Sequence, residues 1–116
     1  MAKHNFRNLE IWIQSMSVVK DVYEVIALFP IDERFGLKSQ MSRCAISVPS
    51  NIAEGSSRSS IKEFSHFLDI ALGSSFELET QLIITQDLFQ VDNSSIIDKC
   101  QHLQRMITGF KQKINN

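Results

Sequence analysis

The stretch from Ser60 to Phe89, SIKEFSHFLDIALGSSFELETQLIITQDLF, decides the fold. Ser60 followed by Glu63 is typical of a capping box, in which each side chain satisfies a free backbone N–H at a helix start. Small and apolar residues then recur at alternating steps of four and three: Phe64, Leu68, Ala71, Ser75, Leu78 and Leu82. This spacing keeps one stripe facing a partner helix. The stretch therefore predicts a long amphipathic helix that ends near Phe89.

The same spacing recurs three more times along the chain. Before the long helix it passes through Leu37, Met41, Cys44, Val48, Ile52 and Gly55. After it, the stripe is Ile96, Cys100, Leu103, Ile107, Phe110 and Ile114. Near the N-terminus it is Leu9, Trp12, Met16, Val19, Tyr23 and Ile26, and this helix should stop before Pro30. Four helices with short connections predict an all-α, antiparallel up-down-up-down four-helix bundle.

A proline lies inside the second predicted helix, in the segment Val48 to Arg58 with the sequence VPSNIAEGSSR. Pro49 lacks an N–H and crowds the carbonyl one turn back, so we expect a kink there. Gly55 suits a helix end.

Composition limits the class of protein. The chain has 116 residues, of which 43% are apolar and 22% charged, with four Gly and two Pro. These values predict one soluble helical domain over residues 1–116. The sequence has no apolar run of signal-peptide or membrane-spanning length, so we expect a cytoplasmic protein without a membrane partner. Cys44 and Cys100 are expected to be reduced core residues.

The first helix carries a second apolar stripe, about 100° around from the first: Ile11, Val18, Val22, Val25 and Phe29. A monomeric bundle needs only one buried stripe on each helix. Extended apolar surface usually marks a partner, so we predict that this second stripe is an interface between copies of the chain.

Charge is distributed unevenly, although the net charge is only −1. Residues 34–62 hold five Lys and Arg against one Glu, whereas residues 63–92 hold six Asp and Glu and no Lys or Arg. An up-down bundle brings six cations to one end: Lys3, Arg7, Arg58, Lys62, Lys111 and Lys113. We interpret this basic end either as a nucleic-acid-binding surface or as a solvated cluster of helix ends.

A polar set accompanies Pro49, because Asn51, Glu54 and Arg58 fall on one helical face. They could form a ligand site. Buried charges persist only when paired, so the favoured interpretation is a structural network between the second and third helices. Its predicted members are Arg43, Asn51, Glu54, Arg58, Glu77 and Glu79.

No motif predicts an enzyme. Glu63-x-x-His66 resembles half of a di-iron site, but the sequence has no second copy of it. The serines around Arg58 have no adjacent His, and the chain contains no Gly-rich phosphate loop. We therefore expect no catalytic residues, no metal and no cofactor.

Two blocks of sequence resemble the bacterial four-helix-bundle family named after the intervening sequences of 23S rRNA genes. The first runs from Phe35 through Arg43 and Ser47–Gly55 to Arg58, and the second from Glu63 to Leu82. This family is similar to the accessory protein of diversity-generating retroelements, a basic bundle that forms a pentameric ring and works with nucleic acid and a reverse transcriptase. The resemblance implies a homo-oligomer, a pentamer, with a role in RNA biology.

Two classes of function remain open at this point. One is an oligomeric adaptor for structured RNA or for an RNA-associated protein, and the other is a structural or protein-binding scaffold without nucleic-acid contact. Salt-dependent binding to RNA would distinguish them.

Overall fold

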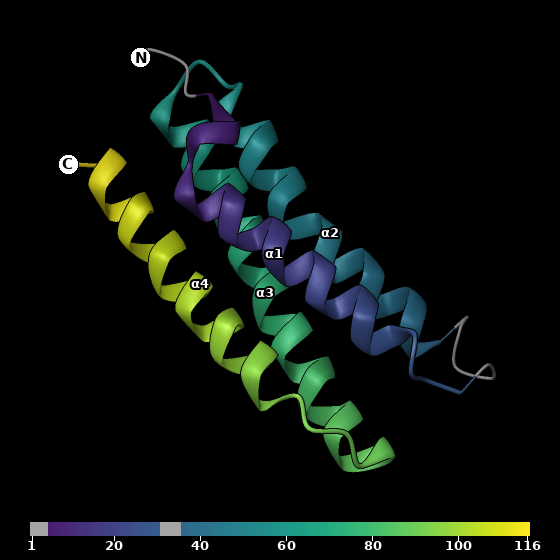
Figure 1. Cartoon of the computed structure of the whole chain (residues 1–116). Helices are drawn as coiled ribbons and strands as arrows, with labels where there is room; N and C mark the ends of the chain where they lie inside the picture. The colour runs from purple at the N-terminus through teal and green to yellow at the C-terminus, as the bar shows by residue number, and fades with distance from the viewer. Residues whose placement is uncertain (1–4, 31–35) are drawn as a thin grey trace.

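The computed structural model describes residues 5–30 and 36–116, which form helices and no strand (Figure 1). A short 3-10 helix, η1 (Phe6–Asn8), precedes four α-helices: α1 (Glu10–Ile26), α2 (Leu37–Ser56), α3 (Ile61–Phe89) and α4 (Ser94–Ile114). The molecule measures 47 × 23 × 20 Å. Within the described ranges, no helix is both long enough and apolar enough to cross a membrane.

Each long helix packs against two neighbours, in the order α1–α2, α2–α3, α3–α4 and α4–α1. The α2–α3 contact is the most extensive of these. The short helix η1, the C-terminal end of α4 and the α2–α3 turn lie at one end of the molecule, and the α3–α4 turn lies at the other (Figure 1). The predicted all-α class is confirmed, and this packing agrees with an up-down bundle.

The core follows the predicted stripe closely on α3. All six predicted positions of α3, from Phe64 to Leu82, are buried. Cys100, Leu103 and Ile107 of α4 are buried as well, and Phe110 packs against the core from its edge. The alternating spacing therefore located the inner faces of these two helices.

On α1 the stripe that faces the core differs from the one predicted. Ile11, Val18 and Val22 of α1 and Phe29 just beyond it are buried within the single chain, and Val25 packs against the core half-buried. The four buried side chains cannot form an exposed interface between copies, so the prediction is wrong for them, and for Val25 it stays a prediction. The stripe predicted to be core is only partly so. Ile26 is buried and Leu9, Trp12 and Val19 pack against the core, but Met16 is 43% and Tyr23 48% exposed.

A polar residue explains why the spacing of apolar residues indicated the wrong core face of α1. Ser15 occupies the inner face of α1 and is 1% exposed. Its hydroxyl donates to the carbonyl of Trp12, 2.7 Å away, within the same helix. A serine bonded to its own helix can lie in an apolar core without an unpaired group. In the sequence, this serine interrupts the apolar spacing of the stripe that is in fact buried.

The α2 helix is continuous through Pro49, which is itself buried. The predicted kink stays a prediction. Gly55 lies near the end of α2, as expected, at a point where α2 and α3 approach each other closely. A Cβ atom at Gly55 would lie 2.8 Å from a ring carbon of Phe64 and 2.9 Å from Cβ of Phe67. Only glycine fits this contact without movement of α3.

The ends of α3 use local polar groups. The Ser60 hydroxyl accepts the backbone N–H of Glu63 at 3.1 Å, as the capping box requires. At the other end Gln90 closes the helix in the left-handed region, with φ 53°. Asn93 is buried in the following turn and donates to the Leu82 carbonyl (2.9 Å) and to Thr85 Oγ1 (2.6 Å). This asparagine therefore fixes the α3–α4 turn to the preceding helix.

Candidate functional site

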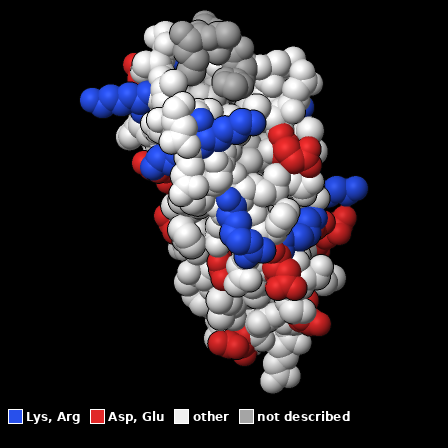
Figure 2. Space-filling model, turned by 90° about the vertical axis from the view of Figure 1, so that its left-hand side faces the viewer, with Lys and Arg blue, Asp and Glu red and all other residues white. Residues whose placement is uncertain are grey.

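The structure brings the predicted cations to one end of the bundle, as far as it describes them. Arg7 lies on η1, Arg58 in the α2–α3 turn, Lys62 in the first turn of α3, and Lys111 and Lys113 in the last turn of α4. Lys3 lies outside the described residues. Figure 2 shows Lys and Arg interspersed with Asp and Glu in the upper and middle parts of one side, whereas Asp and Glu are the only charged side chains visible towards the end formed by the α3–α4 turn. We call the end of the bundle that carries these cations the basic end.

Not all of these cations are available to a partner. Lys111 Nζ contacts Asp69 Oδ1 at 2.5 Å, and Arg58 pairs with Glu54, one turn before it. Among the described residues, Arg7, Lys62 and Lys113 form no ion pair. Surface pairs of this kind contribute little to stability, but they reduce the charge that a polyanion meets. Within the described residues, the basic end of the chain therefore has three cations without an ion pair.

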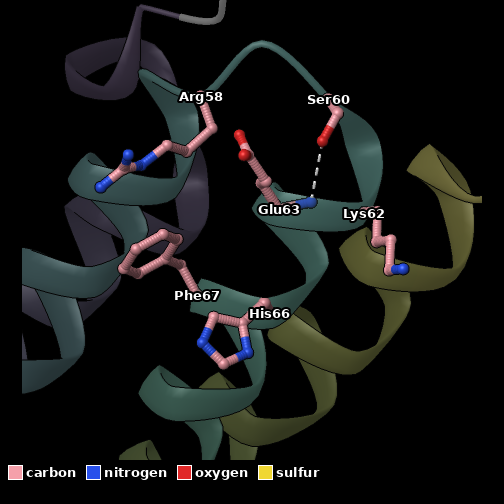
Figure 3. Close-up of a pocket in the computed structure, with 6 residues that line it drawn as sticks. All are labelled: Arg58, Ser60, Lys62, Glu63, His66 and Phe67. Carbon is pink, nitrogen blue, oxygen red and sulfur yellow. Dashed lines mark hydrogen bonds between the residues drawn. The ribbon is translucent and has the colours of Figure 1, made fainter.

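A hollow of about 600 Å³ opens at the α2–α3 turn (Figure 3). Its lining consists of Arg58, Ser60, Lys62, Glu63, His66 and Phe67. The Arg58 guanidinium lies over the Phe67 ring, 4.8 Å from its centroid, and the His66 ring meets the same phenyl edge-on at 5.5 Å. A cation over an aromatic face is attracted to the ring, so Phe67 helps to orient Arg58.

The charged groups of this hollow do not converge. In Figure 3 the side chains of Arg58 and Lys62 point to opposite sides, and the Glu63 carboxylate lies between them. A pocket that holds one phosphate directs its cations at a common point. The hollow therefore lacks the convergent cations of a site for a single phosphate.

Glu63 and His66, the half di-iron motif, both lie exposed at the hollow. In the part of the chain that the structure describes, no group of three or more His, Cys, Asp and Glu could hold a metal ion.

The predicted structural network is divided into separate contacts. Glu54 and Arg58 pair within one segment, and both side chains are at least 40% exposed. Asn51 donates to Ser47, and the Ser47 hydroxyl lies 2.8 Å from that of Ser74 on α3. The α2–α3 link that was predicted for charged groups is therefore made mainly by hydroxyl and amide groups.

The remaining members of that predicted network lie apart from one another. Cys44 Sγ donates to Glu77 Oε2 at 3.5 Å across the α2–α3 contact. Glu79 faces α4 and not α2, because it accepts from Gln101 at 3.0 Å and from Gln104 at 2.8 Å. Arg43 is exposed and bonds to none of the other five. The single network between α2 and α3 is corrected to several small ones, one of which joins α3 to α4.

Sequence reasoning missed a contact between the first and last helices. Lys99 Nζ donates to Ser17 Oγ at 2.6 Å and forms an ion pair with Asp21. Both charged side chains are about one-third exposed, at 34% and 28%. A signal was present, because Ser17 and Asp21 are four residues apart on α1 and share one face. Nothing in the sequence indicated that Lys99 was their partner.

Both cysteines are free thiols. Burial raises the pKa of the Cys100 thiol to about 12, from an ordinary value of 9.0. Burial also raises the pKa of Cys44, which is half-buried beside Glu77. A raised thiol pKa leaves little thiolate at neutral pH, so neither residue is an activated nucleophile.

Apolar side chains remain exposed on two sides of the bundle. A shallow groove of about 320 Å³ runs between α1 and α2, lined by Trp12, Met16, Val19, Ile46, Pro49, Ser50 and Ala53. The outer side of α3 exposes Ile70, Phe76, Ile83, Ile84 and Leu88, from 39% for Ile70 to 65% for Leu88. Single exposed apolar residues are common, whereas runs of them mark contact surfaces.

The structure is a four-helix bundle with two free thiols, a basic end and apolar side chains exposed on two sides. The family model of the 23S rRNA-intervening sequence protein matches residues 7–109. The chain therefore belongs to the 23S rRNA-intervening sequence protein family. A search of curated proteins found no match.

Proposed function

We propose that this protein is a non-enzymatic, homo-oligomeric bundle that acts as an adaptor for RNA or for an RNA–protein complex. The observation that supports self-association is the exposed apolar groove between α1 and α2. Its wall includes Trp12, Met16 and Ile46, and the last two are 43% and 44% exposed. Full burial of an exposed side chain of this size contributes roughly 1.5–3 kcal/mol, and covering the exposed part of Met16 and Ile46 would contribute a fraction of that for each, so contact between copies would be favourable. The family resemblance favours a ring of five.

Light scattering coupled to size exclusion tests the assembly. The chain has a mass of 13.3 kDa, and we expect a species several times heavier. A species of 13 kDa across the micromolar range would overturn self-association.

The RNA part of the proposal depends on the basic end. Arg7, Lys62 and Lys113 are unpaired there within the described residues, and a ring would repeat them in every subunit. Contacts to phosphates release counterions, so binding should weaken steeply as salt is raised. Phe6 and Phe110 offer little stacking surface, since Phe110 packs against the core and Phe6 against Trp12. Recognition would therefore depend on charge and shape more than on base sequence.

A salt series of titrations with structured RNA tests this part. Lys113→Glu should weaken binding at least several-fold, whereas Arg105→Glu, two turns earlier on the same helix, should weaken it less. Equal losses in both variants would mean that the basic end is not the binding surface.

The scaffold alternative is favoured by one observation. Arg58 and Lys111 are each paired with a carboxylate of the same chain, which lowers the positive charge of the basic end. If the intact assembly fails to bind RNA at about 50 mM salt, where counterion release favours binding most, a protein-binding scaffold replaces the adaptor.

A further inference from the structure

We propose that copies of this chain join head to tail, with the outer ridge of α3 from one copy seated in the α1–α2 groove of the next. This inference rests on the proposed self-association and adds to it the two surfaces that meet. The groove is the shallow channel lined by Trp12, Met16, Val19, Ile46, Pro49, Ser50 and Ala53. The ridge is formed by Ile83, Ile84, Asp87 and Leu88, which are all exposed on the last turns of α3.

The shapes of the two surfaces are complementary. Small side chains, Ser50 and Ala53, leave the groove concave between its larger neighbours. On α3, two adjacent isoleucines and Leu88 project outward, with exposed fractions of 43%, 41% and 65%. Helices pack when the ridge of one enters the groove of another. Contact of two grooves would leave a void between them, and contact of two ridges would leave both grooves empty.

The charges beside the two surfaces also differ in sign. Lys20 lies on the exposed face of α1, four residues after Met16 and three before Tyr23. The two acidic residues nearest to it on that helix, Asp21 and Glu24, line a different hollow, between α1 and α4, and Asp21 is already paired with Lys99. The ridge contains Asp87, and residues 63–92 hold no Lys or Arg.

Opposite charges at two complementary surfaces favour contact between unlike surfaces over contact between like ones. Two ridges would bring Asp87 against its own copy, and two grooves would do the same with Lys20. A heterologous contact of this kind leaves one groove and one ridge free at the ends of any open chain. Assembly therefore continues until a ring closes, or extends as a filament if the rotation between copies does not close.

Two variants with matched exposure test the pairing. Ile46→Glu places a charge in the groove, and Ile84→Glu places one on the ridge; the parent residues are 44% and 41% exposed. Each variant alone should be a monomer by light scattering. An equimolar mixture should give a heterodimer of twice the chain mass, because one intact groove and one intact ridge remain. Ile61→Glu, at a residue that is 37% exposed at the start of α3, is the control and should assemble like the parent.

A charge exchange provides a second measurement that does not depend on folding of these variants. Lys20→Glu should raise the dissociation constant of the assembly about tenfold, on the scale of a close charge pair, and adding Asp87→Lys to the same chain should restore it. The inference is overturned if either glutamate variant assembles like the parent, if the mixture stays monomeric, or if the second exchange does not restore assembly. A monomeric parent would overturn self-association itself. A parent that assembles while the variants behave otherwise than expected would overturn only the pairing of groove and ridge.

Discussion

Val22 and Tyr23 are neighbours on α1, yet Val22 is fully buried and Tyr23 is 48% exposed. They belong to two apolar stripes of the same helix, one directed at the core and one at the rim of the α1–α2 groove. The buried stripe contributes to folding of the single chain. The other stripe contributes less within one chain, because Met16 and Tyr23 stay partly exposed, and the apolar character of these two residues is better explained by a contact outside the chain. The spacing of apolar residues predicts that a helix face is buried. It does not indicate whether the same chain or another molecule buries it.

The strongest test of the difference between the two stripes is to place the same charge on each of them. Val22→Asp buries a carboxylate among apolar side chains and should cost at least about 3 kcal/mol, enough to unfold much of the protein. Tyr23→Asp leaves the carboxylate in water and should cost about 1 kcal/mol or less in the folded single chain. Urea unfolding followed by circular dichroism measures both. Equal losses would mean that the two stripes do not differ as the structure shows.

A second matched pair compares the inside and outside of the bundle at two glycines. Gly55→Ala should cost about 1–3 kcal/mol, because the new methyl would overlap Phe64 and Phe67. Gly73→Ala should stabilise α3 by about 0.4–1 kcal/mol, since a Cβ there meets nothing within 4 Å and Ala favours a helix. Thermal unfolding gives both values. A neutral Gly55→Ala would show that α2 and α3 can separate without loss.

The smallest expected effect concerns the two thiols. Cys100 is buried with its pKa raised to about 12, so the native protein should react with a thiol reagent at Cys44 first. The unfolded chain ionises Cys100 near the ordinary value of 9.0, while the folded chain keeps it neutral. The contribution of Cys100 to stability is therefore present below pH 9 and is lost as the pH rises from 9 towards 12.

Labelling at pH 8 followed by mass spectrometry of the peptides checks the order of reaction. Cys100→Ser should weaken the loss of stability between pH 9 and the highest accessible pH, whereas Cys44→Ser should change it less. Simultaneous labelling of both thiols in the native state would contradict the burial of Cys100.

Most of the fold could be predicted from the sequence, since three helices have one dominant stripe each. On α3 the interval from Phe64 to Leu82 contains no competing stripe of equal regularity, and all six predicted positions are buried. On α1 two stripes compete, and the one with Trp12 and Tyr23 has the cleaner spacing. Ser15 interrupts the apolar spacing on the face of α1 that is in fact buried. Its hydrogen bond to the Trp12 carbonyl, which allows it to be buried, cannot be inferred from residue type.

The candidate surfaces were predictable only in part. Helix order was sufficient to gather Arg7, Arg58 and Lys62 with the end of α4. The pairing of Arg58 with Glu54 follows from their i, i+4 spacing, but the contact of Lys111 with Asp69 joins residues 42 apart. Partners at such separations depend on the rotation and height of each helix in the bundle. The same limit explains why Glu79 was assigned to α2 when it contacts α4.

The ion pair of Lys99 with Asp21 joins residues that are 78 positions apart, and it lies at the α1–α4 contact, which joins the first and last of the four long helices. Contacts between consecutive helices close short loops, whereas the α1–α4 contact closes nearly the whole chain. The entropy lost on closure grows with the length of the loop, so we expect α1 and α4 to meet last during folding. Asp21→Asn should then speed unfolding and leave the folding rate unchanged in stopped-flow measurements, and a slower folding rate would place this contact in the transition state.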